Sequence, residues 1–435
     1  MSIREKTTGF KHVTRVEVHL WDQLAGVVAL DPQYGVYAFR FTPEFRSSGI
    51  DPAPLQMPIA EDRTFLFTDL PQETFKGLPA MLRDSLPDDF GNALIYRYMA
   101  DEGLSAKDVT ALDRLAFMSN RAMGALCFKP ARGPMTRKPA AVDLDSLVTE
   151  ARIAVHGTLD DDDQATASLR SIIEVGTSAG GARAKAVVAW NPETNEITSG
   201  HLDAPPGFEH WLLKFDGMGV DAELGATRDY GRIEYAYHLM ALQAGLNMTQ
   251  CRLLTENGRA HFMTRRFDRA DGLRHHMQTL CGMSHLDYKK KGVNSYSQLF
   301  QTISELGLPY QDMEEGFRRM AFNVLARNCD DHTKNFSFLL KQGQAWELAP
   351  AYDVTFAHNP KGEWTQQHLM SVNGKFKNFT AEDLLVEASR FGIGTARRVL
   401  GQVQGAIKDW RKFAENAGVP TAIAAEIGER HMTLL

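Results

Sequence analysis

The chain has 435 residues, a formal net charge of −6, 43% apolar residues and 23% charged residues. This composition is ordinary for a globular protein of two or three domains, and no basic excess indicates nucleic-acid binding by the surface as a whole. No apolar run approaches the ~18 residues of a membrane span, and the first residues lack the apolar core of a signal peptide. Four widely separated cysteines form no CxxC pair, so we expect a cytoplasmic protein with reduced thiols and no membrane partner.

The first third of the chain predicts a small α+β unit. Residues 14–41 alternate like three strands separated by Asp-Pro and Tyr-Gly turn signals. Helical spacing follows within 78–103, after an Asp-Asp-Phe-Gly break, and within 109–120, ahead of a strand-like GALCF segment. Residues 129–141 hold three prolines and four basic residues, which indicates a linker.

The rest of the chain changes from strands to helices. Strand-like segments at 184–190 and 210–217 precede an amphipathic helix at 232–247 and a hairpin at 251–269 with Asn257-Gly258 at its turn. Beyond residue 295, helical patterns dominate and are found at 295–307, 313–327, 380–392 and 395–418. A strand-rich lobe followed by a helical lobe favours a site between the two.

Residues 327–340, RNCDDHTKNFSFLL, place an unusual number of polar side chains ahead of a strand. Asp330 and Asn335 have the D-x4-N spacing of a kinase catalytic loop, in which the aspartate accepts the substrate proton and the asparagine binds metal. A polar loop capping a helix end is the alternative interpretation. Asp353 follows a further strand and hairpin, where phosphoryl transfer needs a second carboxylate on Mg²⁺, although an Asx turn would also place an aspartate there.

Three upstream features complete the order of elements found in a kinase. Glycines in 176–185, GTSAGGARAK, precede a strand and suit a phosphate-binding loop, or simply a flexible connection. Lys214 lies inside the apolar strand WLLKF, and Glu234 on the following helix is its natural partner, unless both face solvent. The strand at 261–269 would then provide a hinge for adenine. The order of these elements is far more specific than any one of them.

These residues resemble the HipA toxin kinases, the serine/threonine kinases of bacterial type II toxin–antitoxin systems. The resemblance covers nearly the whole chain. It is carried by RDSLPDDFGN and MGALCF, by SAGGARAK against the family's S-x-x-G-A-Q-x-K loop, and by WLLKFDG, RRFDR, NCDDHTKNFSF and APAYDV in order. Arg183 stands where the family has a glutamine, and Arg265 stands where a glutamate or glutamine is usual.

The resemblance implies an α+β, two-lobed protein-kinase-like fold with an added N-terminal α+β subdomain and a mostly helical C-terminal lobe. The expected divisions are 1–130 for the N-terminal subdomain, 131–145 for the linker, 146–270 for the ATP-binding lobe and 271–435 for the catalytic lobe. It also implies ATP and Mg²⁺ as cofactors and a protein substrate, as in members that phosphorylate aminoacyl-tRNA synthetases and stall translation. The implied partner is a small helix-turn-helix antitoxin, through which operator DNA is bound.

The resemblance also assigns roles to individual residues. Asp330 is the expected catalytic base, Asn335 and Asp353 are the expected Mg²⁺ ligands, and Ser178 is the expected autophosphorylation site. The residues expected to contact ATP are Ala179, Gly180, Gly181, Ala182, Arg183, Lys185, Lys214, Glu234, Arg265, Phe267, His332 and Lys334.

Two other functions remain open from the sequence. A kinase of a small molecule or lipid could share the same core, because a fold does not fix its substrate. The non-enzymatic alternative is a pseudokinase that acts as a binding or co-repressor module beside an antitoxin. The intact set of Lys214, Asp330, Asn335 and Asp353 argues against it.

Overall fold

The computed structural model describes residues 10–134, 144, 146–149, 151, 184–201, 203–217, 220–221, 225–226, 229–270 and 272–434. The chain divides into two compact units, one of Met1–Asp51 with Ile59–His210 and the other of Pro52–Pro58 with Trp211–Leu435. The predicted segment boundaries at 130, 145 and 270 stay a prediction. Among the described helices, none is long and apolar enough to cross a membrane.

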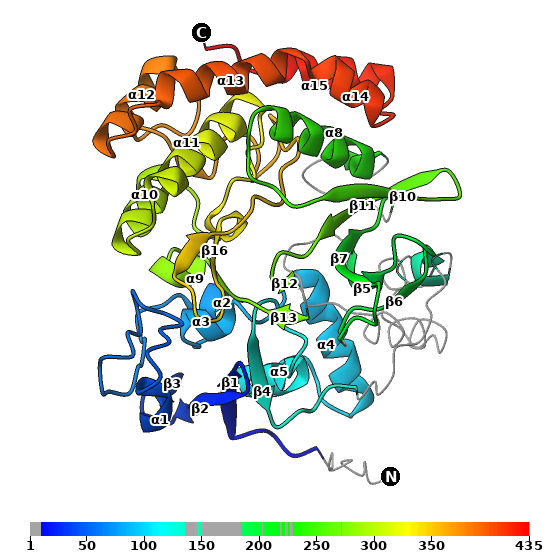
Figure 1. Cartoon of the computed structure of the whole chain (residues 1–435). Coiled ribbons are helices and arrows are strands. Elements are labelled where there is room, and N and C mark those ends of the chain that lie inside the picture. The colour runs from blue at the N-terminus through cyan, green and yellow to red at the C-terminus, as the bar shows by residue number, and fades with distance from the viewer. Residues whose placement is uncertain are drawn as a thin grey trace. The chain divides into compact units, whose positions relative to one another are not determined.

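The first unit begins with an antiparallel sheet in the strand order β3-β2-β1-β4 (Figure 1). Its strands are β1 (Arg15–Leu20), β2 (Gln23–Asp31), β3 (Val36–Phe41) and β4 (Leu126–Lys129). Its helices are α1 (Pro43–Arg46), α2 (Gln72–Phe75), α3 (Ala80–Arg83), α4 (Asp89–Asp101) and α5 (Ala111–Met118). The predicted strands and helices are confirmed.

One boundary in this unit was predicted too late. The Asp-Asp-Phe-Gly segment, residues 88–91, was expected to break the chain ahead of a helix, yet α4 already begins at Asp89. Asp88 takes an extended conformation and occupies the N-cap position. Asp88, Asp89 and Gly91 therefore lie at the start of a helix and do not form a separate turn. Polar residues are favoured at such a position. The unit also contains a hairpin of β5 (Lys185–Trp190) and β6 (Ile197–Ser199).

The second unit holds an antiparallel group of β10 (Cys251–Glu256), β11 (Arg259–Arg265) and the part of β7 (Glu209–Lys214) from Trp211 onward, with β11 in the middle. At the predicted turn, Asn257 and Gly258 have φ values of 44° and 80°, as a type I′ turn requires. Helix α8 (Tyr230–Gln243) packs against β11. A Cβ at Gly231 would stand 2.0 Å from Ala260 O, so glycine is required for this approach.

The second unit also contains further strands and helices. The strands are β8 (Val220–Asp221), β9 (Gly225–Ala226), β12 (Arg269–Ala270), β13 (Leu273–Arg274), β14 (His276–Thr279), β15 (Asn294–Ser295), β16 (Ser337–Leu340), β17 (Trp346–Leu348) and β18 (Met370–Ser371). The helices are α9 (Leu280–Ser284), α10 (Tyr296–Glu305), α11 (Tyr310–Leu325), the 3₁₀ helix η1 (Thr333–Asn335), α12 (Ala381–Arg390), α13 (Ala396–Lys408), α14 (Trp410–Asn416) and α15 (Thr421–Arg430). Capping boxes start α10 at Ser295 and α12 at Thr380.

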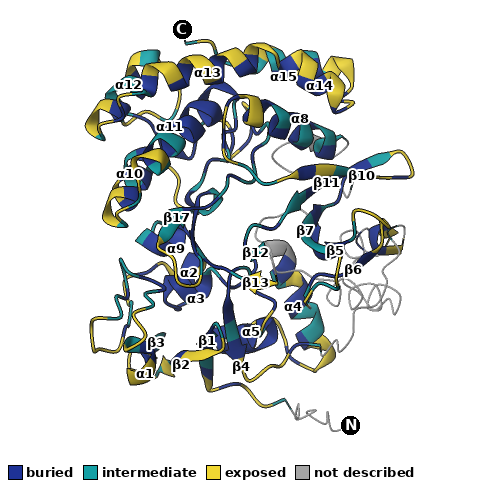
Figure 2. Ribbon diagram, viewed as in Figure 1, coloured by how far each residue is buried: buried dark blue, intermediate teal, exposed yellow. Residues whose placement is uncertain are grey.

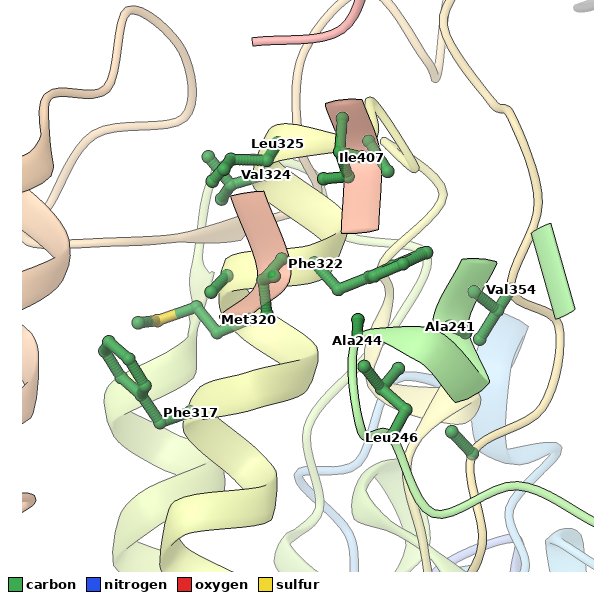
Figure 3. Packing of buried hydrophobic residues seen from close by; sticks show 14 of the residues in the cluster. Ala241, Ala244, Leu246, Phe317, Met320, Phe322, Val324, Leu325, Val354 and Ile407 are labelled. Atoms are coloured by element: carbon green, nitrogen blue, oxygen red, sulfur yellow. The ribbon is translucent and has the colours of Figure 1, made fainter. Parts of the chain in front are cut away.

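The core of the second unit lies between α8, α10, α11 and the C-terminal helices. Buried and exposed residues alternate along α13 at helical spacing, so one face of this helix packs on the unit and the other meets water (Figure 2). Met320 and Phe322 of α11 and Ile407 of α13 belong to one buried apolar cluster (Figure 3). Val354, directly after Asp353, is also part of it.

The last described residues fasten the end of α11. Tyr237 OH donates a hydrogen bond of 2.6 Å to Ala326 O, and His431 Nε2 lies 2.9 Å from the same hydroxyl. Met432 N donates to Leu325 O at 2.8 Å. Burial lowers the pKa of His431 to about 4, so its ring is neutral. These contacts connect α8, the end of α11 and the segment after α15 directly ahead of the loop that carries Asp330.

Candidate active site

The predicted catalytic loop follows α11 and ends in η1 and β16. Asn335 Nδ2 donates a hydrogen bond of 2.7 Å to Asp330 O, which joins the two ends of the D-x4-N segment. This bond uses the amide nitrogen of Asn335 and does not involve its Oδ1. The Asp330 side chain is 50% exposed, and His332 Nε2 lies 3.8 Å from its Oδ1. The predicted base is therefore half exposed to solvent.

The next residue, Asp331, anchors the same loop to the interior of the unit. Its buried carboxylate accepts hydrogen bonds of 2.8 Å from Tyr296 OH, from His368 Nδ1 and from Leu369 N. Burial alone would lower the pKa of His368, but the Asp331 carboxylate more than offsets this and raises the pKa to about 10. The result is a buried ion pair that fixes the backbone on which Asp330 stands.

Lys214, Glu234 and Asp353 form a second cluster. Lys214 Nζ lies 2.5 Å from Glu234 Oε1 and also donates to Asp353 Oδ1. Glu234 is 2% exposed. Burial alone would lower the pKa of Lys214, but the carboxylates of Asp353 and Glu234 more than offset this and hold the pKa above its usual value. The lysine is therefore charged and aimed at the metal-ligand candidate.

Asp353 has a constrained backbone. Its φ of 52° lies in the left-handed region, which non-glycine residues rarely adopt and which is common at functional sites. Tyr352, just before it, donates a hydrogen bond of 2.6 Å from its OH to Lys334 O. Lys334 in turn precedes Asn335. The predicted Mg²⁺ ligands Asn335 and Asp353 directly follow Lys334 and Tyr352. The hydrogen bond between Lys334 and Tyr352 therefore holds the two ligand-bearing loops together.

The predicted hinge lies at the end of β11. The backbone of Arg265 is held by Gln250 O, which accepts from its N–H at 2.9 Å, and by Thr249 Oγ1, which donates to its carbonyl at 2.9 Å. The rings of Phe267 and Tyr352 are 5.8 Å apart and tilted by 38°. An aromatic side chain of the hinge therefore lies beside the residue that precedes Asp353.

The other predicted ATP contacts fall into three groups. His332 and Lys334 lie on the catalytic loop, where the His332 ring is 5.3 Å from the Tyr288 ring and Lys334 Nζ is 5.1 Å from the centre of the Tyr288 ring. Lys185 is a buried residue at the start of β5 in the first unit. Ala179, Gly180, Gly181, Ala182 and Arg183 lie outside the described residues, as does Ser178, the predicted autophosphorylation site.

Three residues that support this arrangement were not predicted from the sequence: Asp331, His368 and Tyr352. Asp331 was not singled out, because the sequence of two adjacent aspartates does not indicate which carboxylate is buried. His368 lies 37 residues from Asp331 in sequence. Tyr352 stands directly before Asp353. Its position beside a predicted metal ligand is the local signal that could have identified it.

The described residues contain no group of three or more His, Cys, Asp or Glu side chains that could hold a metal ion by itself. A kinase metal is held by few protein ligands, because substrate phosphates and water supply the others. Asn335 Oδ1 and the Asp353 carboxylate are hard oxygen donors and fit such a shared Mg²⁺ site. The Lys214 ammonium fits the phosphates themselves.

Fold and site together define a protein with a kinase-like α+β architecture, as predicted. Two profiles match the sequence: the HipA-like C-terminal domain over residues 177–433 and the HipA N-terminal domain over residues 16–129. The chain belongs to the HipA family.

Individual proteins that resemble this chain have low sequence identity to it. A curated protein of Sinorhizobium fredii, named "Putative kinase Y4mE", is 28% identical over 125 residues, which span 26% of this chain and 30% of that protein. HipA in the Shewanella oneidensis complex of HipA, HipB and operator DNA has a TM-score of 0.69 at 18% identity, covering 95% of each chain. The Helicobacter pylori kinase CtkA has a TM-score of 0.32 at 13% identity, covering 51% of this chain and 88% of its own. The Shewanella likeness shows the shared fold.

Proposed function

We propose that the protein is an ATP- and Mg²⁺-dependent protein kinase of the HipA type that phosphorylates serine or threonine. The observation that carries the proposal is the contact of Lys214 with both Glu234 and Asp353. A protein kinase needs its strand lysine paired with a helical glutamate, together with an aspartate placed for the metal. A buried lysine shared by two carboxylates has little structural use, because charges buried only for stability are costly.

The residues then divide the work of phosphoryl transfer. ATP with Mg²⁺ supplies the transferable phosphoryl group and neutralises part of its charge. Lys214 orients the phosphates, Asn335 and Asp353 hold the metal, and Phe267 lines the adenine side with the Arg265 backbone. Asp330 accepts the proton of the substrate hydroxyl, a role for which a half-exposed carboxylate on a fixed backbone is suited. Glu234 positions Lys214.

We place the kinase in a toxin–antitoxin system. The structural neighbour from Shewanella is HipA in a toxin–antitoxin complex with HipB and operator DNA. This complex supports a small helix-turn-helix antitoxin as the partner and DNA contact through it. The proposed substrate is a protein such as an aminoacyl-tRNA synthetase, whose phosphorylation would inhibit translation in the cytoplasm. A helix-turn-helix reading frame adjacent to the coding sequence would support this placement, and its absence would favour a kinase outside such a system.

Ser178 is proposed as a site of self-inactivation. Phosphorylation adds about −1.5 to −2 charge and three acceptor oxygens, which conflicts with bound ATP in a loop that must close over its phosphates. Incubation with Mg-ATP should place phosphate on Ser178, detected by mass spectrometry, and Ser178→Asp should bind ATP poorly. Phosphate found only on other residues, or full ATP affinity of Ser178→Asp, would reject this step.

The proposed activity is tested by incubating the purified full chain with radiolabelled ATP and Mg²⁺ and following transfer to itself and to a generic protein substrate. Transfer that requires Mg²⁺ and disappears in Asp330→Ala is expected. ATP binding without transfer would favour the pseudokinase alternative. Transfer to small molecules with none to protein would favour a small-molecule kinase.

A further inference from the structure

The residue two positions beyond Lys214 connects the end of β7 to the start of α8. This residue, Asp216, is 4% exposed. Its Oδ2 accepts a hydrogen bond of 3.3 Å from Asp229 N, and its Oδ1 accepts one of 3.5 Å from Gly231 N. Both donors belong to the N-terminal end of α8, where backbone N–H groups have no acceptor inside the helix. Asp216 therefore caps α8 from the segment that follows β7.

The helix does not provide this cap with its own residues. Asp229 occupies the N-cap position of α8, but its side chain forms no capping hydrogen bond and its φ of 68° is left-handed. Burial raises the pKa of Asp216 above its ordinary value, although hydrogen bonds from three backbone N–H groups at the start of α8 partly offset this. Within the part of the chain that the structure describes, Asp216 forms no ion pair. Its charge is stabilised by the N–H groups and by the dipole of α8.

The backbone of Asp216 is held by β11. Asp216 N donates a hydrogen bond of 2.9 Å to His261 Nδ1, and the His261 ring is fully buried. The preceding residue, Ala260, is the one that Gly231 of α8 approaches so closely that a Cβ there would stand 2.0 Å from Ala260 O. The end of β7, strand β11 and the first turn of α8 thus meet around Asp216.

This meeting point lies about one helical turn ahead of Glu234. Gly231 precedes Glu234 by three residues, and Lys214 precedes Asp216 by two. Glu234 Oε1 is 2.5 Å from Lys214 Nζ. The two partners of this ion pair therefore start from the two segments that Asp216 connects. A movement of α8 by about 1 Å would take them beyond hydrogen-bond distance.

We propose that Asp216 is a positioning residue that sets α8 against β7 and thereby determines whether Glu234 pairs with Lys214. This inference rests on the proposed kinase function, in which the pair prepares Lys214 for the phosphates of ATP. Asp216 acts through Glu234 and has no part in the transfer itself. Loss of its carboxylate releases the first turn of α8 and allows Glu234 to move away from Lys214.

A cap that serves only the stability of α8 is the simpler role for the same carboxylate. Helix caps of this kind stabilise the folded protein wherever they occur. The two roles differ when Glu234 is absent, because a positioning residue then has nothing left to position. Two changes that act through one contact are not additive, whereas independent changes are.

A double-mutant cycle on Mg-ATP affinity, measured by isothermal titration of the full chain, separates the two roles. Asp216→Ala and Glu234→Gln should each weaken binding about fivefold, the effect of one hydrogen bond. The double variant should bind no more weakly than Glu234→Gln alone. Asp216→Asn, which keeps one acceptor oxygen and serves if Asp216→Ala does not fold, should show a smaller loss that also disappears in the Glu234→Gln background. Additive losses would overturn the proposal.

A second measurement needs no nucleotide. Acetylation of Lys214 by sulfo-N-hydroxysuccinimide acetate, followed by mass spectrometry, reports how much of the lysine is unprotonated. Loss of the Glu234 contact should raise the labelling rate, about tenfold for each unit by which the pKa of Lys214 falls. Asp216→Ala should reproduce the rise seen in Glu234→Gln. Labelling of Lys214 that stays unchanged in Asp216→Ala would also overturn the proposal.

The matched control is Thr380→Ala, because Thr380 caps α12 in the same unit by accepting a hydrogen bond of 3.3 Å from Asp383 N. This variant should lower the midpoint of urea denaturation as Asp216→Ala does, while Mg-ATP affinity and Lys214 labelling stay unchanged. Equal effects of both variants on all three measurements would leave Asp216 as a structural cap only. If the labelling rates follow the expected pattern but the unmodified protein does not bind Mg-ATP, the proposed function fails and the positioning role of Asp216 stands.

Discussion

The two aspartates of the catalytic loop are adjacent in sequence and have opposite surroundings. Asp331 is buried and accepts three hydrogen bonds, one of them from a charged histidine. Asp330 is half exposed, and the nearest nitrogen of His332 is 3.8 Å away. The carboxylate that holds the backbone has its hydrogen-bonding capacity largely filled, while the one assigned to chemistry stays accessible. Changing each aspartate should therefore affect different properties of the protein.

Replacing the exposed aspartate should cause the largest loss of activity. Asp330→Ala is expected to lower the rate of phosphoryl transfer by about 10³-fold, within the range for removing a general base. Its melting temperature should stay close to that of the unmodified protein, because the side chain is half exposed. Asp353→Ala should also abolish transfer, through loss of a metal ligand. Near-normal turnover in either variant, measured with radiolabelled ATP, would contradict that residue's assignment.

Replacing the buried aspartate should instead lower the free energy of unfolding. Asp331→Ala removes the partner of His368 and leaves Tyr296 OH and Leu369 N without their acceptor, at a cost of about 3–5 kcal/mol. Urea denaturation followed by circular dichroism measures this change. If Asp331→Ala proved as stable as Asp330→Ala, the contrast drawn between the two neighbours would be wrong.

The ion cluster of Lys214 can be tested by nucleotide affinity. Lys214→Ala should weaken Mg-ATP binding by about 10- to 100-fold, the effect of a charged hydrogen bond to phosphate. Isothermal titration measures the dissociation constant, and Lys412→Ala on the exposed face of α14 is the control. Unchanged affinity in Lys214→Ala would show that the lysine serves only its two carboxylates.

The buried ion pair also predicts a dependence of stability on pH. The pKa of His368 is raised to about 10 in the folded protein, above the ordinary value of 6.5. Its contribution is therefore complete below about pH 6.5 and is lost as pH rises toward 10. The difference in unfolding free energy between the unmodified protein and His368→Gln should shrink over this window. A difference that stays constant from pH 6 to 10 would mean that His368 is not charged.

Adding a methyl group where α8 packs closely on β11 should have the smallest effect on nucleotide binding. Gly231→Ala would place a methyl group against Ala260 O and shift α8 away from β11. Glu234, on the first turn after it, would then move relative to Lys214. We expect ATP affinity to fall by a few-fold, with stability lowered by about 1–3 kcal/mol. Wild-type values for both, from titration and denaturation, would show that α8 tolerates the shift.

Local patterns made much of this structure predictable. The Asn257-Gly258 turn, the strand before Lys214 and the D-x4-N segment are all encoded within a few residues of one another. The contacts that give the site its shape are not local: His368 meets Asp331 across 37 residues, and Asp353 meets Lys214 across 139. Periodicity carries no information about such pairs. The two-residue strands β15 and β18 are likewise too short to leave an alternating pattern.

The hydrogen bonds of the last described residues have a consequence for how the protein is made. Met432 contacts Arg327, 105 residues earlier, and His431 contacts Tyr237, 194 residues earlier. A ribosome adding about 5–20 residues per second needs roughly 5–20 s to cover the shorter of these intervals. Asp330 and Asp353 are both synthesised early in this interval, before the contacts that fasten the end of α11 can form. The end of α11, directly ahead of Asp330, therefore gains these contacts only after Met432 has been added.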